Sequence, residues 1–119
     1  MAQDTFDTMT LDELKQRMNN AAPENFNTIS GYALVNVLKP EAYEKEHIPG
    51  SINIPQGNEE AFQERFRPDK EIIVYCASFD CNASPSVAKR LTEMGFQHVH
   101  DYQGGMTDWK AGDNLVSGA

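Results

Sequence analysis

Short apolar runs alternate along the chain with segments that have the spacing of amphipathic helices, and this alternation limits the fold more than any other feature. The expected strands are a short one near Phe6 to Met9, then Tyr32 to Val37, Ser51 to Ile54, "EIIVYC" (Glu71 to Cys76) and "HVHDY" (His98 to Tyr102). The expected helices are Leu11 to Met18, "PEAYEKE" from Pro40, Glu59 to Phe66, and Ser84 to about Gly95. Strands and helices in this alternating order predict an α/β fold with a mostly parallel five-stranded sheet and helices on both faces.

Helix-start signals fix two of these helices. Thr10 stands before the first helix with Glu13 three residues later, which is the pattern of a capping box. Ser84 followed by Pro85 predicts an N-cap and a first helical residue for the helix that ends at Gly95.

Length and charge limit the organisation and the partners. The 119 residues suit one domain, which we expect to span residues 1–119 with a core from about 5 to 112 and a disordered tail "GDNLVSGA". The net charge of −8 disfavours nucleic acid and anionic membranes as partners. The N-terminal segment has no signal-peptide pattern and no stretch is long enough to span a bilayer, so we expect a cytoplasmic protein.

Both cysteines lie in the segment "VYCASFDCNASP", Val74 to Pro85. Cys76 ends an apolar strand, and the loop after it runs into a helix start. In parallel sheets, ligands bind outside the carboxyl ends of the strands, and the amides and dipole of a helix N-terminus there favour a thiolate. The pattern predicts a nucleophilic thiol, although Cys76 as a merely buried apolar residue stays an alternative.

Three segments together resemble the single-domain rhodaneses, sulfurtransferases that carry sulfane sulfur as a persulfide on a loop cysteine. "LVNVLKPEAYEKEHIPGSINIP" (Leu34 to Pro55) resembles the strand, helix and His-Ile-Pro-Gly signature of the family. "IIVYC" (Ile72 to Cys76) resembles the strand before the active cysteine, and "GFQHVHDYQGGMTDW" (Gly95 to Trp109) resembles the closing strand and Gly-Gly-x-x-x-Trp segment. The resemblance implies a rhodanese-like domain with Cys76 as the catalytic residue.

The cysteine loop departs from the family pattern. The family commonly has Arg five residues after the cysteine, followed by Ser or Thr, whereas this chain has Cys81 and Asn82. The loop is also about two residues longer, and the Asp-x-Arg of the second strand is replaced by Asn36 and Leu38. Without a cation near Cys76, and with Asp80 in the loop, the dianion thiosulfate should be a poor donor.

The main hypothesis is a sulfurtransferase or sulfur carrier that takes sulfur from a small-molecule or protein persulfide and passes it to a thiol acceptor. The active-site loop is then Ala77, Ser78, Phe79, Asp80, Cys81, Asn82 and Ala83, whose amides hold the persulfide anion. Cys81 is a candidate resolving or relay thiol, because its distance along the loop permits a disulfide with Cys76. Cys81 as a packing residue is the other interpretation.

Two further functions stay open. One is a non-catalytic rhodanese-like module that binds a partner or senses oxidation through the Cys76 and Cys81 pair. The other is a phosphatase or arsenate reductase, which the missing Arg disfavours because oxyanion chemistry relies on such a clamp.

Residues near the proposed site receive supporting roles. Asn36, His47, Gly104 and Gly105 are expected to surround the cysteine loop, with His47 in a structural role and the glycines allowing a tight turn against the loop. His98 and His100 share one strand face, but two histidines are too few for a metal site. We therefore expect no metal and no cofactor.

Overall fold

The computed structural model describes residues 6–20, 31–112, 114 and 116–118. Five strands form one sheet: β1 (Asp7–Met9), β2 (Tyr32–Asn36), β3 (Ile52–Asn53), β4 (Glu71–Tyr75) and β5 (His98–Tyr102). Their order is β1-β5-β4-β2-β3, and every neighbouring pair is parallel. The predicted α/β class and five-stranded sheet are confirmed. The expected domain limits fall partly outside the described residues and stay a prediction.

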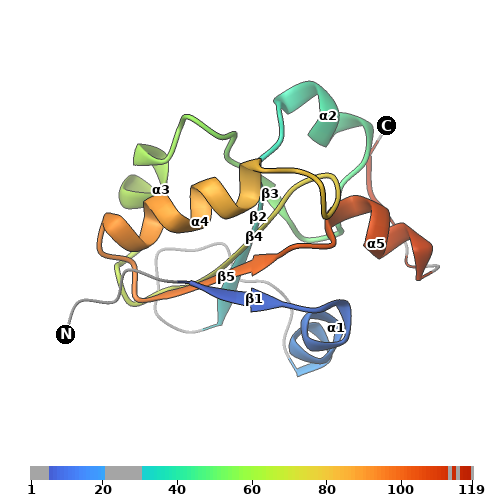
Figure 1. Cartoon of the computed structure of the whole chain (residues 1–119), viewed down its shortest axis with the longest axis horizontal. Helices are drawn as coiled ribbons and strands as arrows, with labels where there is room; N and C mark the ends of the chain where they lie inside the picture. The colour runs from blue at the N-terminus through green and yellow to red at the C-terminus, as the bar shows by residue number, and fades with distance from the viewer. Residues whose placement is uncertain (1–5, 21–30, 113, 115, 119) are drawn as a thin grey trace.

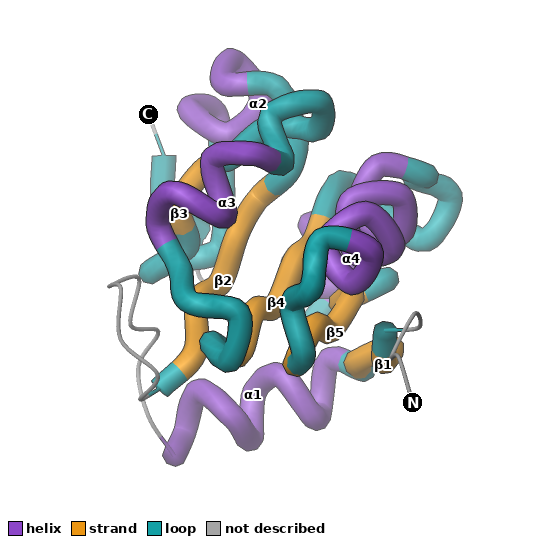
Figure 2. The backbone as a smooth tube through the Cα atoms, turned by 90° about the vertical axis from the view of Figure 1, so that its left-hand side faces the viewer, coloured by secondary structure: helices purple, strands orange, loops and turns teal. Residues whose placement is uncertain are grey.

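Helices cover both faces of the sheet, as Figures 1 and 2 show. They are α1 (Leu11–Asn20), α2 (Pro40–Lys45), α3 (Glu60–Arg65), α4 (Ala83–Glu93) and α5 (Gly105–Ala111). In Figure 1, α3 and α4 lie above the sheet and α1 lies below it. None of the helices in the described ranges is both long and apolar enough to cross a bilayer.

The side-chain period of two along the strands divides the core into two clusters. One face of the sheet packs with residues of α3 and α4, and its strand members are Ala33, Val35, Ile72, Val74 and Val99. The other packs with α1 and α5, and its strand members are Tyr32, Leu34, Ile73, Tyr75 and Tyr102. Because β2 and β4 are buried on both faces, they read in sequence as continuous apolar runs rather than as alternating ones.

The capping box before α1 forms as predicted. The Thr10 N–H donates to Glu13 Oε1 over 2.9 Å, and the Glu13 N–H donates to Thr10 Oγ1 over 3.2 Å. These two bonds satisfy backbone donors that a helix start leaves free.

The predicted start of α4 is wrong. The helix begins at Ala83, Asn82 occupies the N-cap position, and Pro85 is the third helical residue rather than the first. Pro85 fits there because N–H groups of the first turn have no partner within a helix. Ser84 does not cap the helix; its side chain is buried, with 1% of the residue exposed.

The predicted tail segment includes residues that the structure describes. Within it, Ser117 pairs antiparallel with His47, and each N–H donates to the other residue's carbonyl over 2.9 Å. This pairing connects the end of the described chain to His47, two residues after the end of α2. The segment that we expected to be disordered thus has a defined partner at Ser117.

Candidate active site

Cys76 directly follows β4, the central strand of the sheet. Its side chain belongs to the cluster on the α4 face, and only 1% of the residue is exposed. It therefore lies at the carboxyl edge of the sheet, where parallel α/β folds place their ligands.

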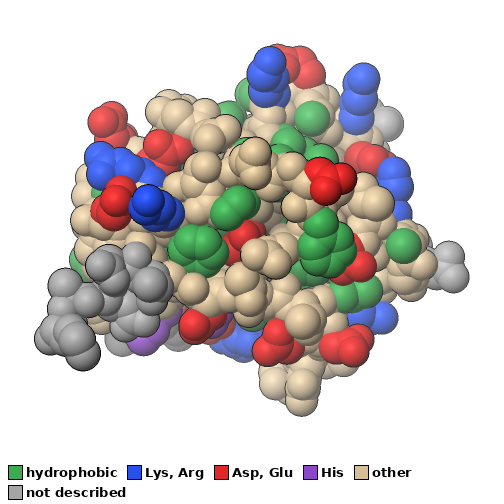
Figure 3. Space-filling model, in the orientation of Figure 1, with side chains coloured by type: hydrophobic (Ala, Val, Ile, Leu, Met, Phe, Trp, Pro, Cys, Tyr) green, Lys and Arg blue, Asp and Glu red, His purple; other side chains and the backbone are tan. Residues whose placement is uncertain are grey.

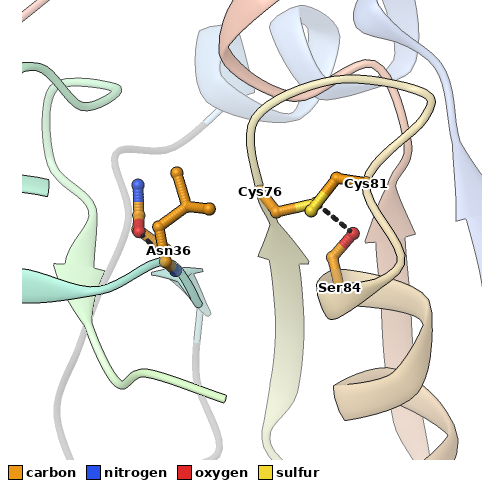
Figure 4. The surroundings of a disulfide bond; sticks show 5 residues. Asn36, Cys76, Cys81 and Ser84 are labelled. Carbon is orange, nitrogen blue, oxygen red and sulfur yellow. Dashed lines mark hydrogen bonds between the residues drawn. A yellow bond between two sulfur atoms is a disulfide. The ribbon is translucent and has the colours of Figure 1, made fainter. Parts of the chain in front are cut away.

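The loop after Cys76 turns back so that the second cysteine meets the first (Figure 4). The Cys81 N–H donates to the Ser78 carbonyl over 3.1 Å, which closes a turn. Cys76 and Cys81 are joined as a disulfide, and their Cα atoms are 6.5 Å apart. Within the described chain, the N–H groups of Ser78, Phe79 and Asp80 have no protein acceptor, which leaves them available to an anion.

Helix α5 binds the backbone carbonyl groups at the start of the same loop. The Met106 N–H donates to the Cys76 carbonyl over 3.0 Å, and the Thr107 N–H donates to the Ala77 carbonyl over 2.9 Å. Gly105, at φ +61°, lies so close that a Cβ there would clash with the Cys76 oxygen. The close approach and the left-handed backbone together explain why this position needs glycine.

A pocket of about 250 Å³ opens beside the disulfide. It is lined by Phe79, Cys81, Asn82, Ser84, Pro85, Asp101 and Gln103. Ser84 Oγ lies 3.4 Å from Cys76 Sγ (Figure 4), so the hydroxyl reaches the sulfur from the first turn of α4. Cys81 is half-buried and lines the pocket, so the disulfide is approached from the Cys81 side.

The electrostatic character of this pocket is acidic. None of the residues that line the pocket is Lys or Arg. On the face of the molecule seen in Figure 3, Lys and Arg lie towards the edges of that face. Asp101 is fully buried, and burial raises the pKa of its carboxyl; neither carboxylate oxygen has a hydrogen-bond partner among the described residues. A dianionic substrate would therefore meet no fixed cation in this pocket.

The His-Ile-Pro-Gly turn is attached to the site strand through Tyr75. The Ile48 N–H donates to the Tyr75 hydroxyl over 3.0 Å, and Ser51 Oγ lies 2.8 Å from the same oxygen. His47 itself stacks on the Tyr43 ring and places Nδ1 2.8 Å from the Tyr43 carbonyl. These contacts give the turn a role in holding the end of β4 in place.

Asn36 is buried but does not share the side of the sheet on which Cys76 lies. Alternation along β2 puts it on the face of Tyr32 and Leu34. Its Oδ1 accepts the Leu38 N–H over 2.9 Å, so it shapes the turn from β2 towards α2. The structure brings Cys81 and Gly105 to Cys76, whereas the side chains of Asn36 and His47 are engaged elsewhere.

Sequence reasoning missed Ser84 and Asp101 as neighbours of the cysteine pair. The sequence pattern predicts an N-cap role for Ser84, which gives no reason to expect its hydroxyl near a cysteine sulfur. Asp101 carried a signal, because the period of two in "HVHDY" places it on the same face as Val99. A carboxylate on the core-facing side of a strand is unusual and marks a candidate functional group.

Comparisons with known proteins agree with this architecture. A family model described as "Rhodanese-like domain" matches residues 10–112. A protein named thiosulfate sulfurtransferase GlpE from Coxiella burnetii is 32% identical over 78 residues, which cover 66% of this chain and 71% of that protein. One of the same name from Pseudomonas syringae is 34% identical over 80 residues, covering 67% of this chain and 74% of that protein.

Solved structures show the same fold. A crystal structure of a protein from Bacillus halodurans has a TM-score of 0.79 at 27% identity, covering 96% of this chain and 77% of that one. The solution structure of a rhodanese-like domain from Anabaena also has a TM-score of 0.79, at 21% identity, covering 98% of this chain and 80% of that one.

Proposed function

Because this chain belongs to the rhodanese-like domain family, we propose that it is a sulfurtransferase that carries sulfane sulfur as a persulfide on Cys76 and passes it to a thiol acceptor. The observation that carries the proposal is the position of Cys76. It directly follows the central strand, and in the loop after it three N–H groups, those of Ser78, Phe79 and Asp80, have no acceptor among the described residues. Those groups, together with the start of α4, supply the donors that a persulfide anion requires.

The reaction needs two displacements at sulfur. The Cys76 thiolate attacks the outer sulfur of the donor, and the donor leaves as a thiolate. An acceptor thiolate then attacks the outer sulfur of the Cys76 persulfide, and Cys76 becomes the leaving group. Before the first step, the Cys76–Cys81 disulfide must be reduced by a dithiol.

The relatives named thiosulfate sulfurtransferase make thiosulfate the obvious donor to consider. The pocket next to Cys76 disfavours it, because its lining includes Asp101 and no Lys or Arg. Repulsion between a dianion and a thiolate would be offset only by loop amides and by the dipole of α4, and a helix dipole contributes about 0.3–1 kcal/mol per charge at exposed sites. We infer that an uncharged or protein-bound persulfide is the better donor.

Intact mass spectrometry tests the proposal. The reduced protein is treated with an alkyl persulfide, and we expect a gain of one sulfur atom that a thiol acceptor removes. Cys76→Ser should gain none, and Cys81→Ser, which keeps Cys76, should still gain it. No gain in the wild type, or an equal gain in Cys76→Ser, would refute the assignment. Aryl phosphate turnover abolished by Cys76→Ser would favour the phosphatase reading instead.

A second candidate function is redox sensing, which the contact between Cys76 and Cys81 favours. In this version, oxidation of Cys76 to a sulfenic acid is followed by attack of the Cys81 thiolate, with loss of water and formation of the disulfide. After mild peroxide, peptide mapping without reductant should find the Cys76–Cys81 crosslink in the wild type. Cys81→Ser should accumulate sulfinic Cys76. Identical Cys76 products in both proteins would leave Cys81 only a packing role.

A further inference from the structure

Phe79 is an exposed aromatic residue in the cysteine loop. It is 70% exposed, more than any other large hydrophobic residue that the structure describes. A single exposed apolar side chain is common on a protein surface and needs no explanation by itself. Phe79 differs because two pockets open against it, and one of them is the pocket beside the disulfide.

The second pocket lies between the cysteine loop, the junction of β1 with α1, and the turn before α5. Its volume is about 310 Å³, and it is lined by Thr8, Met9, Thr10, Leu11, Asp12, Phe79, Tyr102, Gln103, Gly104 and Asp108. Phe79 and Gln103 also line the pocket beside the disulfide. Because the two pockets share these residues, they form one groove, which runs from the start of α1 to Cys81.

The end of the groove near α1 is suited to an apolar side chain. Met9 and Leu11 pack against the core on the α1 and α5 side of the sheet but are only partly buried, so part of each side chain stays available. The Tyr102 hydroxyl donates to Asp108 Oδ2 over 2.8 Å, which holds both side chains in place at the pocket wall. Together with Phe79, these residues form an apolar site with a polar edge.

The groove is acidic at both ends. Asp12 and Asp108 line one pocket, Asp101 lines the other, and neither lining includes Lys or Arg. Asp80, next to Phe79 in the loop, is exposed. Asp101 is 0% exposed, and neither of its carboxylate oxygens has a hydrogen-bond partner among the described residues. A buried carboxylate without a partner costs free energy, so a cation bound in this pocket would be stabilised.

The two pockets together fit a polypeptide better than a small molecule. Neither cysteine lines the second pocket, so a small thiol that reaches the disulfide leaves that pocket empty. A polypeptide segment can fill both, because successive residues of an extended chain are about 3.3 Å apart. A second copy of this chain fits poorly, since its net charge of −8 opposes an acidic groove.

We propose that the groove docks a basic polypeptide segment of a partner protein, with an apolar side chain against Phe79 and Leu11 and a cysteine thiol at Cys76. Lys and Arg of the segment pair with the carboxylates of the groove. This inference rests on the proposed function, because the partner is then the acceptor of the sulfur that Cys76 carries. The partner thiolate attacks the outer sulfur of the Cys76 persulfide, the S–S bond breaks, and Cys76 leaves as a thiolate while the partner becomes the persulfide.

The test uses two synthetic peptides that each contain a cysteine and a leucine. The basic peptide has Arg on both sides of the cysteine, the acidic peptide has Glu at the same positions, and 2-mercaptoethanol is the small thiol. Each thiolate attacks Cys81 of the Cys76–Cys81 disulfide, Cys76 leaves as a thiolate, and iodoacetamide traps it for intact mass. Each rate is divided by the rate of the same thiol with bis(2-hydroxyethyl) disulfide, which corrects for intrinsic thiol reactivity.

At low ionic strength, the corrected rate of the basic peptide should exceed those of the acidic peptide and of 2-mercaptoethanol by at least about tenfold. The difference should shrink as the ionic strength rises from about 0.01 M to about 0.1 M. Equal corrected rates for the two peptides would overturn the proposal. Cysteamine, a small thiol with an ammonium group, would overturn it as well if it reacted as fast as the basic peptide, because the occupant would then be a small aminothiol.

Phe79→Ala and Val116→Ala form a matched pair of variants. Phe79→Ala should lower the ratio of the basic-peptide rate to the 2-mercaptoethanol rate about tenfold, as truncation of a central interface residue does. Val116, which is 41% exposed and lines neither pocket, should give the wild-type ratio when truncated. An unchanged ratio in Phe79→Ala would refute the docking site. A dimer in sedimentation that Phe79→Ala abolishes would make a second copy the occupant and refute it too.

Asp12→Asn tests the charge of the groove, and Asp69→Asn is its counterpart. Asp69 precedes β4 and so lies at the opposite edge of the sheet from Cys76. The preference for the basic peptide should fall about twofold in Asp12→Asn and stay unchanged in Asp69→Asn. An equal fall in both variants would assign the preference to the whole protein and refute the groove.

None of these rates involves a persulfide, so docking is tested separately from the proposed function. A preference for the basic peptide that depends on Phe79, in a protein whose Cys76 gains no sulfur, would support docking and refute sulfur transfer. A gain of sulfur without that preference would refute docking alone.

Discussion

A single glycine determines how closely α5 can approach the cysteine loop. Gly105→Ala should destabilise the protein and slow sulfur loading, because the new Cβ would clash with the Cys76 carbonyl and the backbone is left-handed. The left-handed conformation alone costs about 1–2 kcal/mol for a residue with a Cβ. Urea unfolding measures the first effect, and the rate of persulfide formation on Cys76 measures the second.

Gly95→Ala is the control for this prediction. Gly95 also has a positive φ, +104°, but a Cβ there meets nothing within 4 Å. This variant should lose stability through backbone strain while it loads sulfur at the wild-type rate. If Gly105→Ala loaded sulfur as fast as Gly95→Ala, the contact between α5 and the loop would have no role in the reaction.

At the residue scale, the sequence predicts which thiol is presented but not what surrounds it. The prediction of Cys76 rests on an apolar run that ends before a polar loop, and this is a local pattern. The approach of Ser84 and Asp101 depends on how α4 packs over β5, elements that are separate in the chain, and no local pattern fixes that distance. A strand period extended to "HVHDY" would have placed Asp101 on the buried face, but not beside Cys76.

At the element scale, Glu71 connects α1 with two strands. His100 Nε2 lies 3.4 Å from Glu71 Oε2, and Arg17 Nη2 donates to Glu71 Oε1 over 2.9 Å. Hydrogen bonding to His100, with a further contribution from Arg17, lowers the pKa of Glu71 to about 2 although burial opposes the shift. Arg17 also covers the Tyr32 ring, 4.4 Å from its centroid.

This cluster predicts an acid-dependent loss of stability. A carboxyl whose pKa is lower in the folded state stabilises the fold fully above its unfolded value, 4.5, and the contribution disappears as the pH falls towards about 2. The difference in unfolding free energy between wild type and Glu71→Gln should therefore shrink as the pH is lowered from about 6 to about 3. Urea titrations across this range measure it, and a difference that does not change with pH would contradict the assignment.

Asp69→Asn provides the exposed counterpart. The Arg67–Asp69 pair has side-chain exposures of 60% and 39%, so its contribution is screened by solvent. We expect this variant to match the wild type within error across the same pH range.

The elements themselves were largely predictable, and the errors have local causes. Buried strands and the capped α1 have strong patterns in the sequence. Helix α5 was not predicted, because Gly104 and Gly105 indicate a turn and the helix that begins at Gly105 has only 7 residues. The spacing of Met106 and Trp109, which both face the core, was the available signal.

At the scale of the whole molecule, the net charge of −8 acts on any anionic donor. Raising the ionic strength from about 0.01 M to about 0.1 M shortens the Debye length from about 30 Å to about 10 Å. Loading of Cys76 from thiosulfate should therefore accelerate severalfold with salt, whereas loading from an uncharged alkyl persulfide should not change. Intact mass against time measures both rates.

Cys81→Arg places a cation at the position where the family commonly has one. It should raise the rate of loading from thiosulfate and weaken the acceleration by salt, because part of the repulsion is then offset locally. A variant that persulfidates normally with the alkyl donor but keeps the wild-type thiosulfate rate would show that the absence of charge is not what limits thiosulfate.

The order of the strands could not be derived from the alternation of strands and helices alone. That alternation predicts a parallel sheet, yet several strand orders are compatible with it, and no local pattern selects one of them. The observed order, β1-β5-β4-β2-β3, puts the strand that presents Cys76 at the centre.

The pairing of the first strand with the last has a kinetic consequence. In the described sheet, β1 is hydrogen-bonded to β5 alone. The β1 strand therefore cannot join the sheet before β5 is in place. Contacts between such distant segments carry a high loop-closure cost and slow the folding of parallel sheets. As a nascent chain leaves the ribosome, β2, β3 and β4 can associate first. When β5 emerges, it can pair with β4 and β1, and the same late step places Asp101, which lies on β5, at the cysteine pocket.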